Sequence, residues 1–281
     1  MDYAGLFPPA SLGMPEAVAQ YASYLISPDA WMLGRLVVPV SRLNELAAAL
    51  APASAASGPW KVSAVGGEDY AADAARIATL GAARAGSLVV DVVEVKAATT
   101  QDIERAARAL SGASALYVEV SHRTEPREAL IAVKSVGARA KIRTGGITPD
   151  AMPSSSDVAR FIFRCAEVGV AFKATAGLHH PLRGEHPLTY ASDSPTAMMF
   201  GFLNVFLASA FARAGADENE LHAVLEERSA AAFVFGDEGV RWRSRHLPVE
   251  QLASARRDFA VAFGSCSFRE PVDELRELVL L

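Results

Sequence analysis

Short apolar runs rich in β-branched residues alternate with segments of helical periodicity along most of this chain. Each run has the length of a strand, and glycine, proline or polar residues at its ends favour turns. The predicted strands are residues 3–7, 35–40, 61–66, 87–96, 115–121, 141–144, 173–176 and 232–235.

The segments between these runs predict helices. Thr100, Gln101 and Asp102 are typical of a helix N-terminus, and the cluster 154–157 (Ser-Ser-Ser-Asp) offers capping side chains. We expect helices at residues 15–25, 41–50, 70–84, 100–110, 126–136, 156–168, 196–214 and 218–228. The predicted loops are 51–58 and 179–194, and the tail 247–281 is predicted to be largely helical with a break at 264–266.

Strands that alternate with helices indicate a parallel sheet. Eight such units within about 240 residues favour an α/β fold of the (β/α)8 TIM-barrel type over an open doubly wound sheet. No Gly-x-Gly-x-x-Gly motif follows the first predicted strand, which argues against a dinucleotide-binding fold. We therefore predict a single domain over residues 1–281, with the barrel in about 1–240 and a helical C-terminal extension in about 241–281.

Composition excludes several partners. The net charge of −5, without a basic stripe, argues against binding to nucleic acid or to an anionic membrane. Two cysteines offer neither a disulfide framework nor zinc spacing, and residues 1–5 lack the features of a signal peptide, so we expect a cytoplasmic protein. The apolar stretch 197–212, interrupted by Asn204, is too short for a membrane span and predicts a buried helix, with a homo-oligomer contact as its explanation.

Lysine is used unusually in this chain. There are 22 arginines but only five lysines, and four of the lysines fall in predicted strands. A buried ammonium group is costly unless it is paired, yet lysine, unlike arginine, can be tuned to act as a nucleophile or base. The four strand lysines are Lys61, Lys96, Lys141 and Lys173.

Alternate residues of a barrel strand point inward, and the catalytic face lies at the C-terminal ends of the strands. If the lysines face inward, four consecutive strands direct one group of side chains into a common pocket. This group comprises Glu94, Lys96, Tyr117, Glu119, Lys141, Arg143, Lys173 and Thr175. The opposite parity would turn Asp91, Val93 and Val95 inward and set the lysines against the apolar helices, which costs more.

An inward cluster of this kind indicates function, because buried ion pairs add little net stability. A lysine that forms an imine must be neutral, so its pKa has to fall from about 10.4 to roughly 7–8. Burial and a neighbouring cation both lower it. We expect repulsion between Lys141 and Lys173 to leave one of them uncharged, and Glu119 or Tyr117 to relay protons.

These residues resemble the class I (Schiff-base) aldolases, most closely the deoxyribose-phosphate aldolase family. That family carries its imine-forming lysine in Lys-Thr-Ser-Thr-Gly on the sixth strand and a second, pKa-lowering lysine in Lys-x-x-Gly-Gly on the seventh. Over about 40 residues, this chain offers Lys141-Ile-Arg-Thr-Gly145 and Lys173-Ala-Thr-Ala-Gly177. Position favours Lys141 as the nucleophile, whereas local sequence favours Lys173. The resemblance implies catalytic roles for Lys141 and Lys173, and strand parity adds Glu119 as the third predicted catalytic residue.

The remaining candidates surround this centre. Gly145, Gly146 and Gly177 predict an anion site, with Arg143 or Arg183 as a clamp. His179, His180 and His186 follow the seventh strand, where His122 could join them; we expect a solvated or substrate-touching loop there rather than a metal site, with a proton shuttle as an alternative role for one histidine. The predicted substrate-binding residues are Glu94, Lys96, Arg143, Thr175, His179 and His180, with no cofactor. Cys266 is predicted to be structural, because no base is evident beside it.

Three functions therefore compete. The first is a lyase or aldolase that acts on a small anionic ketone or aldehyde through a lysine imine. The second uses the same cations only to hold phosphate or carboxylate, as in phosphoribosyl transfer or decarboxylation; residues 173–178 are similar to the lysine-containing strand of quinolinate phosphoribosyltransferases. The third is a non-catalytic barrel, whose inner polar residues would pair with one another and leave no cavity.

Overall fold

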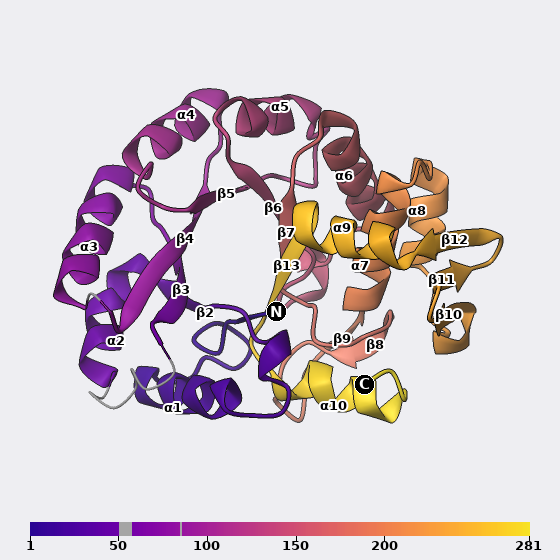
Figure 1. Ribbon diagram of the computed structural model, residues 1–281, viewed down its shortest axis with the longest axis horizontal. Helices are drawn as coiled ribbons and strands as arrows, with labels where there is room; N and C mark the ends of the chain where they lie inside the picture. The colour runs from indigo at the N-terminus through magenta and orange to yellow at the C-terminus, as the bar shows by residue number, and fades with distance from the viewer. Residues whose placement is uncertain (51–57, 85) are drawn as a thin grey trace.

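The computed structural model describes residues 1–50, 58–84 and 86–281. The loop predicted at 51–58 therefore lies, except for Gly58, outside the described residues. Eight parallel strands close into a barrel in the order β1-β13-β7-β6-β5-β4-β3-β2 (Figure 1). These strands are β1 (Asp2–Tyr3), β2 (Leu36–Pro39), β3 (Trp60–Val65), β4 (Leu88–Lys96), β5 (Ala115–Glu119), β6 (Arg139–Arg143), β7 (Phe172–Thr175) and β13 (Ala260–Ser265). The predicted (β/α)8 class is confirmed.

Helices surround the barrel in Figure 1. They are α1 (Met14–Leu25), α2 (Leu43–Ala49), α3 (Tyr70–Ala83), α4 (Thr100–Ala109), α5 (Arg127–Ser135), α6 (Ser155–Val168), α7 (Phe202–Arg213), α8 (Glu218–Leu225), α9 (Val249–Asp258) and α10 (Arg269–Glu277). Local sequence explains their ends. Thr99 forms a capping box with Asp102 at α4, Ser154 caps α6, and Gly169 ends α6 in a left-handed conformation. Among the described residues, no helix has the length and apolar character needed to cross a bilayer.

The eighth barrel strand is not the one predicted. Residues 232–235 contribute instead to β10 (Phe233–Gly236), which pairs antiparallel with β11 (Gly239–Trp242), and β12 (Arg245–Pro248) completes this small sheet outside the barrel (Figure 1). Its exposed Val234 and Phe235 show why the apolar run was misleading, since apolar residues on a surface sheet look like a core strand. The barrel is closed by β13, which pairs with β7 and β1.

The barrel boundary moves with this correction. Residues 241–281, predicted as a helical extension, contain β11, β12, α9, the closing strand β13 and α10. The glycine and serine at the end of β13 resemble a break in a helix. The local sequence pattern does not show that this segment pairs with β7 and β1. The predicted helix at 196–214 also divides: β9 (Thr196–Met199) pairs with β8 (Gly184–Pro187), and α7 begins at Phe202.

The strands face the helices with one side and the barrel axis with the other. The outer apolar layer contains Val93, Val118, Ile142 and Ala174, which are fully buried. Because side chains alternate along a strand, the neighbours of these residues point toward the barrel axis, which is the parity predicted for the lysines. Phe172 of β7 joins this layer to the closing strand. Its ring centroid lies 5.3 Å from that of Phe161 and 5.3 Å from that of Phe259, in edge-to-face contacts.

Replacing Phe172 with alanine should lower the free energy of unfolding by about 3–5 kcal/mol, because it empties a fully buried aromatic site. Val234→Ala serves as the matched control. Val234 is 59% exposed on β10, so this change should stay within about 0.5 kcal/mol. Urea denaturation measures both values. A comparable loss from the two substitutions would contradict the assignment of β10 to the surface.

Candidate functional site

A buried network of two lysines and three carboxylates lies inside the barrel. Lys173 of β7 pairs with Asp2 Oδ2 and with Glu94 Oε1, both at 2.6 Å from its Nζ. Lys141 of β6 lies 3.0 Å from Glu94 Oε2 and 3.0 Å from Glu119 Oε2. Glu94 therefore links the two lysines, and it also accepts a hydrogen bond from buried Ser63 on β3 at 2.7 Å.

Strand register explains this meeting. Lys96 is paired with Glu119, Glu119 with Lys141, and Lys141 with Lys173 across four adjacent parallel strands, so each of these residues neighbours the next across the sheet. Glu94 lies two residues before Lys96 on the same face of β4. The predicted inward parity is therefore confirmed.

Electrostatics set the charge of the network. Burial alone would raise the pKa of Glu94, but the ammonium groups of Lys173 and Lys141 outweigh it and hold that pKa well below its ordinary value of 4.5. Burial alone would lower the pKa of Lys173, but Asp2 and Glu94 outweigh it and raise that pKa above its ordinary value of 10.5. Both carboxylates favour the ammonium form of Lys173, which disfavours its use as the neutral amine.

The repulsion expected between the two lysines is also corrected. Three carboxylates surround the two ammonium groups, and Glu94 lies between them. Attraction rather than repulsion dominates, because opposite charges at about 3 Å in a buried site interact strongly. Lys141 differs from Lys173 in one respect. Its partner Glu119 has an oxygen, Oε2, that is buried yet lacks a hydrogen bond of good geometry within the described chain.

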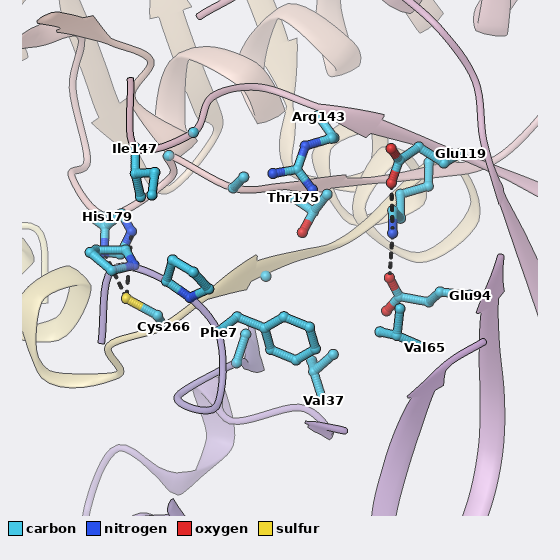
Figure 2. A pocket seen from close by; sticks show the side chains of 18 of the residues that line it. Phe7, Val37, Val65, Glu94, Glu119, Arg143, Ile147, Thr175, His179 and Cys266 are labelled. Atoms are coloured by element: carbon cyan, nitrogen blue, oxygen red, sulfur yellow. Dashed lines mark hydrogen bonds and ion pairs between the residues drawn. The ribbon is translucent and has the colours of Figure 1, made fainter. Parts of the chain in front are cut away.

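A cavity of about 810 Å³ opens above this network. Figure 2 shows Glu94, Glu119, Arg143, Thr175 and His179 around it. The nine residues predicted for catalysis and substrate binding all line this cavity: Glu94, Lys96, Glu119, Lys141, Arg143, Lys173, Thr175, His179 and His180. A second hollow of about 500 Å³ shares Lys96, Glu119 and Arg143 with it.

Other expected residues lie elsewhere. Arg183 contacts Glu226 at 2.8 Å and stacks on Phe200, outside the cavity lining, so it does not serve as the clamp. His122 lines only the smaller hollow. Tyr117 faces inward, with its ring 5.6 Å from the Lys173 amine, but accepts a hydrogen bond from Arg139 outside the cavity lining. Position in the sequence alone could not show which of the predicted residues line the cavity and which do not.

The glycines at the strand ends serve close packing. Gly177 has a φ of +74°, and a Cβ added to it would lie 3.1 Å from the Cα of Gly145. Glycine is required there because a side chain would strain the backbone and separate the ends of β6 and β7. Gly146 and Gly177 also line the cavity, where their backbone N–H groups are available to an anion. The anion site itself stays a prediction.

The cavity mouth holds a cluster that sequence reasoning missed. Cys266 follows β13, and its Sγ lies 3.8 Å from His179 Nε2. His179 Nδ1 lies 3.0 Å from Glu270 Oε2 of α10, and Tyr190 donates to the same oxygen at 3.1 Å. The prediction that Cys266 has no base beside it is therefore wrong. His179 and Cys266 are 87 residues apart, and no local signal joins them.

The neighbouring histidines are also anchored. His180 Nδ1 lies 2.6 Å from Glu274 Oε1, and its ring stacks on His186 with centroids 3.4 Å apart. Among the described residues, no group of three or more His, Cys, Asp or Glu side chains is arranged to hold a metal ion. The sequence matches no protein-family model and no curated protein.

Glu94→Gln should lower the free energy of unfolding at pH 7 by about 3–5 kcal/mol, because it leaves Lys173 and Lys141 short of a buried partner. The pH dependence should change as well. Because the folded pKa of Glu94 is depressed, its contribution is present above the ordinary value of 4.5 and is lost as pH falls below it. The variant should therefore lose less stability than the wild type between about pH 5 and pH 3.

Urea denaturation across this pH range measures the effect. Glu128→Gln, at an exposed position of α5, is the matched control and should follow the wild type. If Glu94→Gln also followed the wild type, the network would not be bearing on stability.

Proposed function

We propose that this protein is a cytoplasmic lyase-type enzyme that acts on a small anionic carbonyl compound through an imine on Lys141. One observation carries the proposal: Lys141 lines a cavity of about 810 Å³, and its amine lies 3.0 Å from Glu119. Pockets of this volume are usual for small-molecule sites.

The role of Glu119 follows from the proton that an ammonium group must lose before it attacks a carbonyl. Its Oε2 is buried and lies within reach of the Lys141 amine. As the N–C bond forms, the π electrons of the carbonyl move to its oxygen. That oxygen then leaves as water with two protons of the original ammonium group, which Glu119 transfers, and a protonated imine remains.

Lys173 contributes a fixed positive charge. Its two carboxylate partners keep it protonated, and together they hold Glu94 ionised. Glu94 is thus committed to the lysines and cannot act as an acid near neutral pH. This division of roles supports Lys141 as the nucleophile and Glu119 as the proton carrier.

The anionic end of the substrate is assigned to two exposed cations of the cavity wall. Lys96 and Arg143 are exposed there, at the ends of β4 and β6, and both line the cavity. A guanidinium group matches a carboxylate or phosphate in two parallel hydrogen bonds. A substrate with one anionic end would meet these cations while its carbonyl carbon points toward Lys141.

A second candidate is the anion-holding barrel without an imine. It is favoured by the two carboxylates at 3.0 Å from the Lys141 amine, which stabilise an ammonium group. The non-catalytic barrel is disfavoured, because the inner polar residues leave a large open cavity.

Borohydride trapping separates these candidates. Incubation with pyruvate or glyoxylate and sodium borohydride should attach the reduced carbonyl compound to Lys141, as mapped by peptide mass spectrometry. Lys141→Arg should abolish the adduct, since a guanidinium group forms no imine, whereas Lys61→Arg at an exposed position of β3 should leave it unchanged. Retained turnover in Lys141→Arg, with no adduct in the wild type, would favour the anion-holding barrel.

Glu119→Gln should slow formation of the trapped adduct by roughly 100-fold, the lower end of what a positioned proton carrier contributes. The matched control is Glu68→Gln, because Glu68 lines the same cavity from an exposed position. Rapid-quench measurement of adduct formation gives both rates. Equal rates in the two variants would remove Glu119 from the mechanism.

A further inference from the structure

A thiol, an imidazole and a carboxylate meet on the cavity wall, apart from the lysine network. Figure 2 shows His179 and Cys266 at one end of the view and Glu94 and Glu119 at the other. Cys266, His179, Glu270 and Tyr190 all line the same cavity as Lys141. The proposed function uses none of these four residues.

The geometry gives each group a distinct role. Glu270 Oε2 lies 3.0 Å from His179 Nδ1, so the carboxylate holds the proton on that nitrogen. The Cys266 sulfur lies beside the ring, 3.8 Å from Nε2 and 4.0 Å from Nδ1, within reach of the nitrogen that is left free. A base oriented by a third group is the arrangement that activates nucleophilic side chains. Burial alone would lower the pKa of His179, but Cys266 and Glu270 outweigh it and raise that pKa to about 9, which favours transfer of the thiol proton to the imidazole.

Tyr190 supplies a further donor. Its hydroxyl lies 3.6 Å from Cys266 Sγ and 3.1 Å from Glu270 Oε2. Burial raises the pKa of Tyr190, with Cys266 and Glu270 adding to the effect, so the hydroxyl keeps its proton. An oxygen that becomes negative beside the sulfur would therefore find hydrogen-bond donors on both His179 and Tyr190.

The other cysteine provides the contrast. Cys165 of α6 is fully buried in the apolar layer, and burial raises the pKa of its thiol well above the ordinary value. A thiol in that environment is inert, because the thiolate is the nucleophilic form. Cys266 differs in facing a cavity with a base beside it.

We propose that Cys266 is a nucleophilic thiol, served by His179 and Glu270, that adds reversibly to the carbonyl carbon of an anionic aldehyde in this cavity. A C–S bond forms while the π electrons of the carbonyl move to its oxygen. The thiol proton passes through the His179 imidazole to that oxygen, and the product is a hemithioacetal that has a neutral hydroxyl group and keeps the anionic group of the aldehyde. The choice of an aldehyde rests on the proposed function, whereas the reactivity of the thiol rests on the cluster alone.

Alkylation with iodoacetamide tests the thiol in the full-length protein. Peptide mapping over time should show rapid modification of Cys266 and slow modification of Cys165. His179→Gln should slow alkylation of Cys266 by about 100-fold, because it removes the base. Glu270→Gln should slow it less, because it removes only the group that orients the base.

Cys165 also reports on folding in these variants, since it becomes reactive only if the apolar layer opens. A Cys266 rate that stays near wild type in His179→Gln, with Cys165 still protected, would overturn the proposal. So would a Cys266 that reacts no faster than Cys165 in the wild type.

Protection by glyoxylate tests the aldehyde. Glyoxylate should slow alkylation of Cys266 at lower concentrations than it slows alkylation of free N-acetylcysteine, and glycolate, which lacks the carbonyl group, should not. Equal protection by glycolate, or protection no stronger than that of N-acetylcysteine, would overturn covalent capture.

The same assay in Lys141→Arg separates the two proposals. Protection that persists in this variant supports capture by Cys266, even if borohydride yields no adduct on Lys141. Protection that disappears with Lys141 would mean that glyoxylate reacts with the lysine alone, and would overturn the role of Cys266.

Discussion

The carboxylate of Glu94, shared between two buried ammonium groups, is the interaction on which the centre of this barrel depends. Burying a charge without a partner costs several kcal/mol, and two neighbouring lysines would double that cost. Glu94 reaches both, while Asp2 adds a second partner for Lys173 and Glu119 a second partner for Lys141. Asp2 lies on β1, which joins β13 to β2, so closing the barrel also completes the pairing of Lys173.

This pairing makes the two lysines unequal. Lys173 is nearly inaccessible and is held by two carboxylates at 2.6 Å, which makes it a structural cation. Both lysines line the cavity, but Lys141 shares Glu94 and is also paired with Glu119, whose Oε2 makes no hydrogen bond within the described chain. The barrel therefore holds two lysines on adjacent strands, and the electrostatics between them is set by carboxylates rather than by mutual repulsion.

The cavity has two chemical ends because two parts of the chain build it. Strands β4 to β7 contribute the amine and carboxylate groups, whereas the loop after β7, the end of β13 and α10 contribute the imidazole, thiol and carboxylate of the mouth. The β8–β9 segment adds Tyr190 above them. Groups at both ends can react with a carbonyl carbon, which is why the proposals for Lys141 and Cys266 concern one class of substrate.

The sequence by itself determined the barrel class and the inward cluster. Strand alternation has a period of two, and the cost of burying an ammonium group selects the parity, so Glu94, Glu119, Lys141 and Lys173 follow from local pattern and solvation. Only the tertiary structure decided which strand closes the barrel and which residues complete the site. Lys173 and Asp2 are 171 residues apart, and His179 and Cys266 are 87 apart. Such partners are chosen by the closure of the sheet, which no local periodicity records.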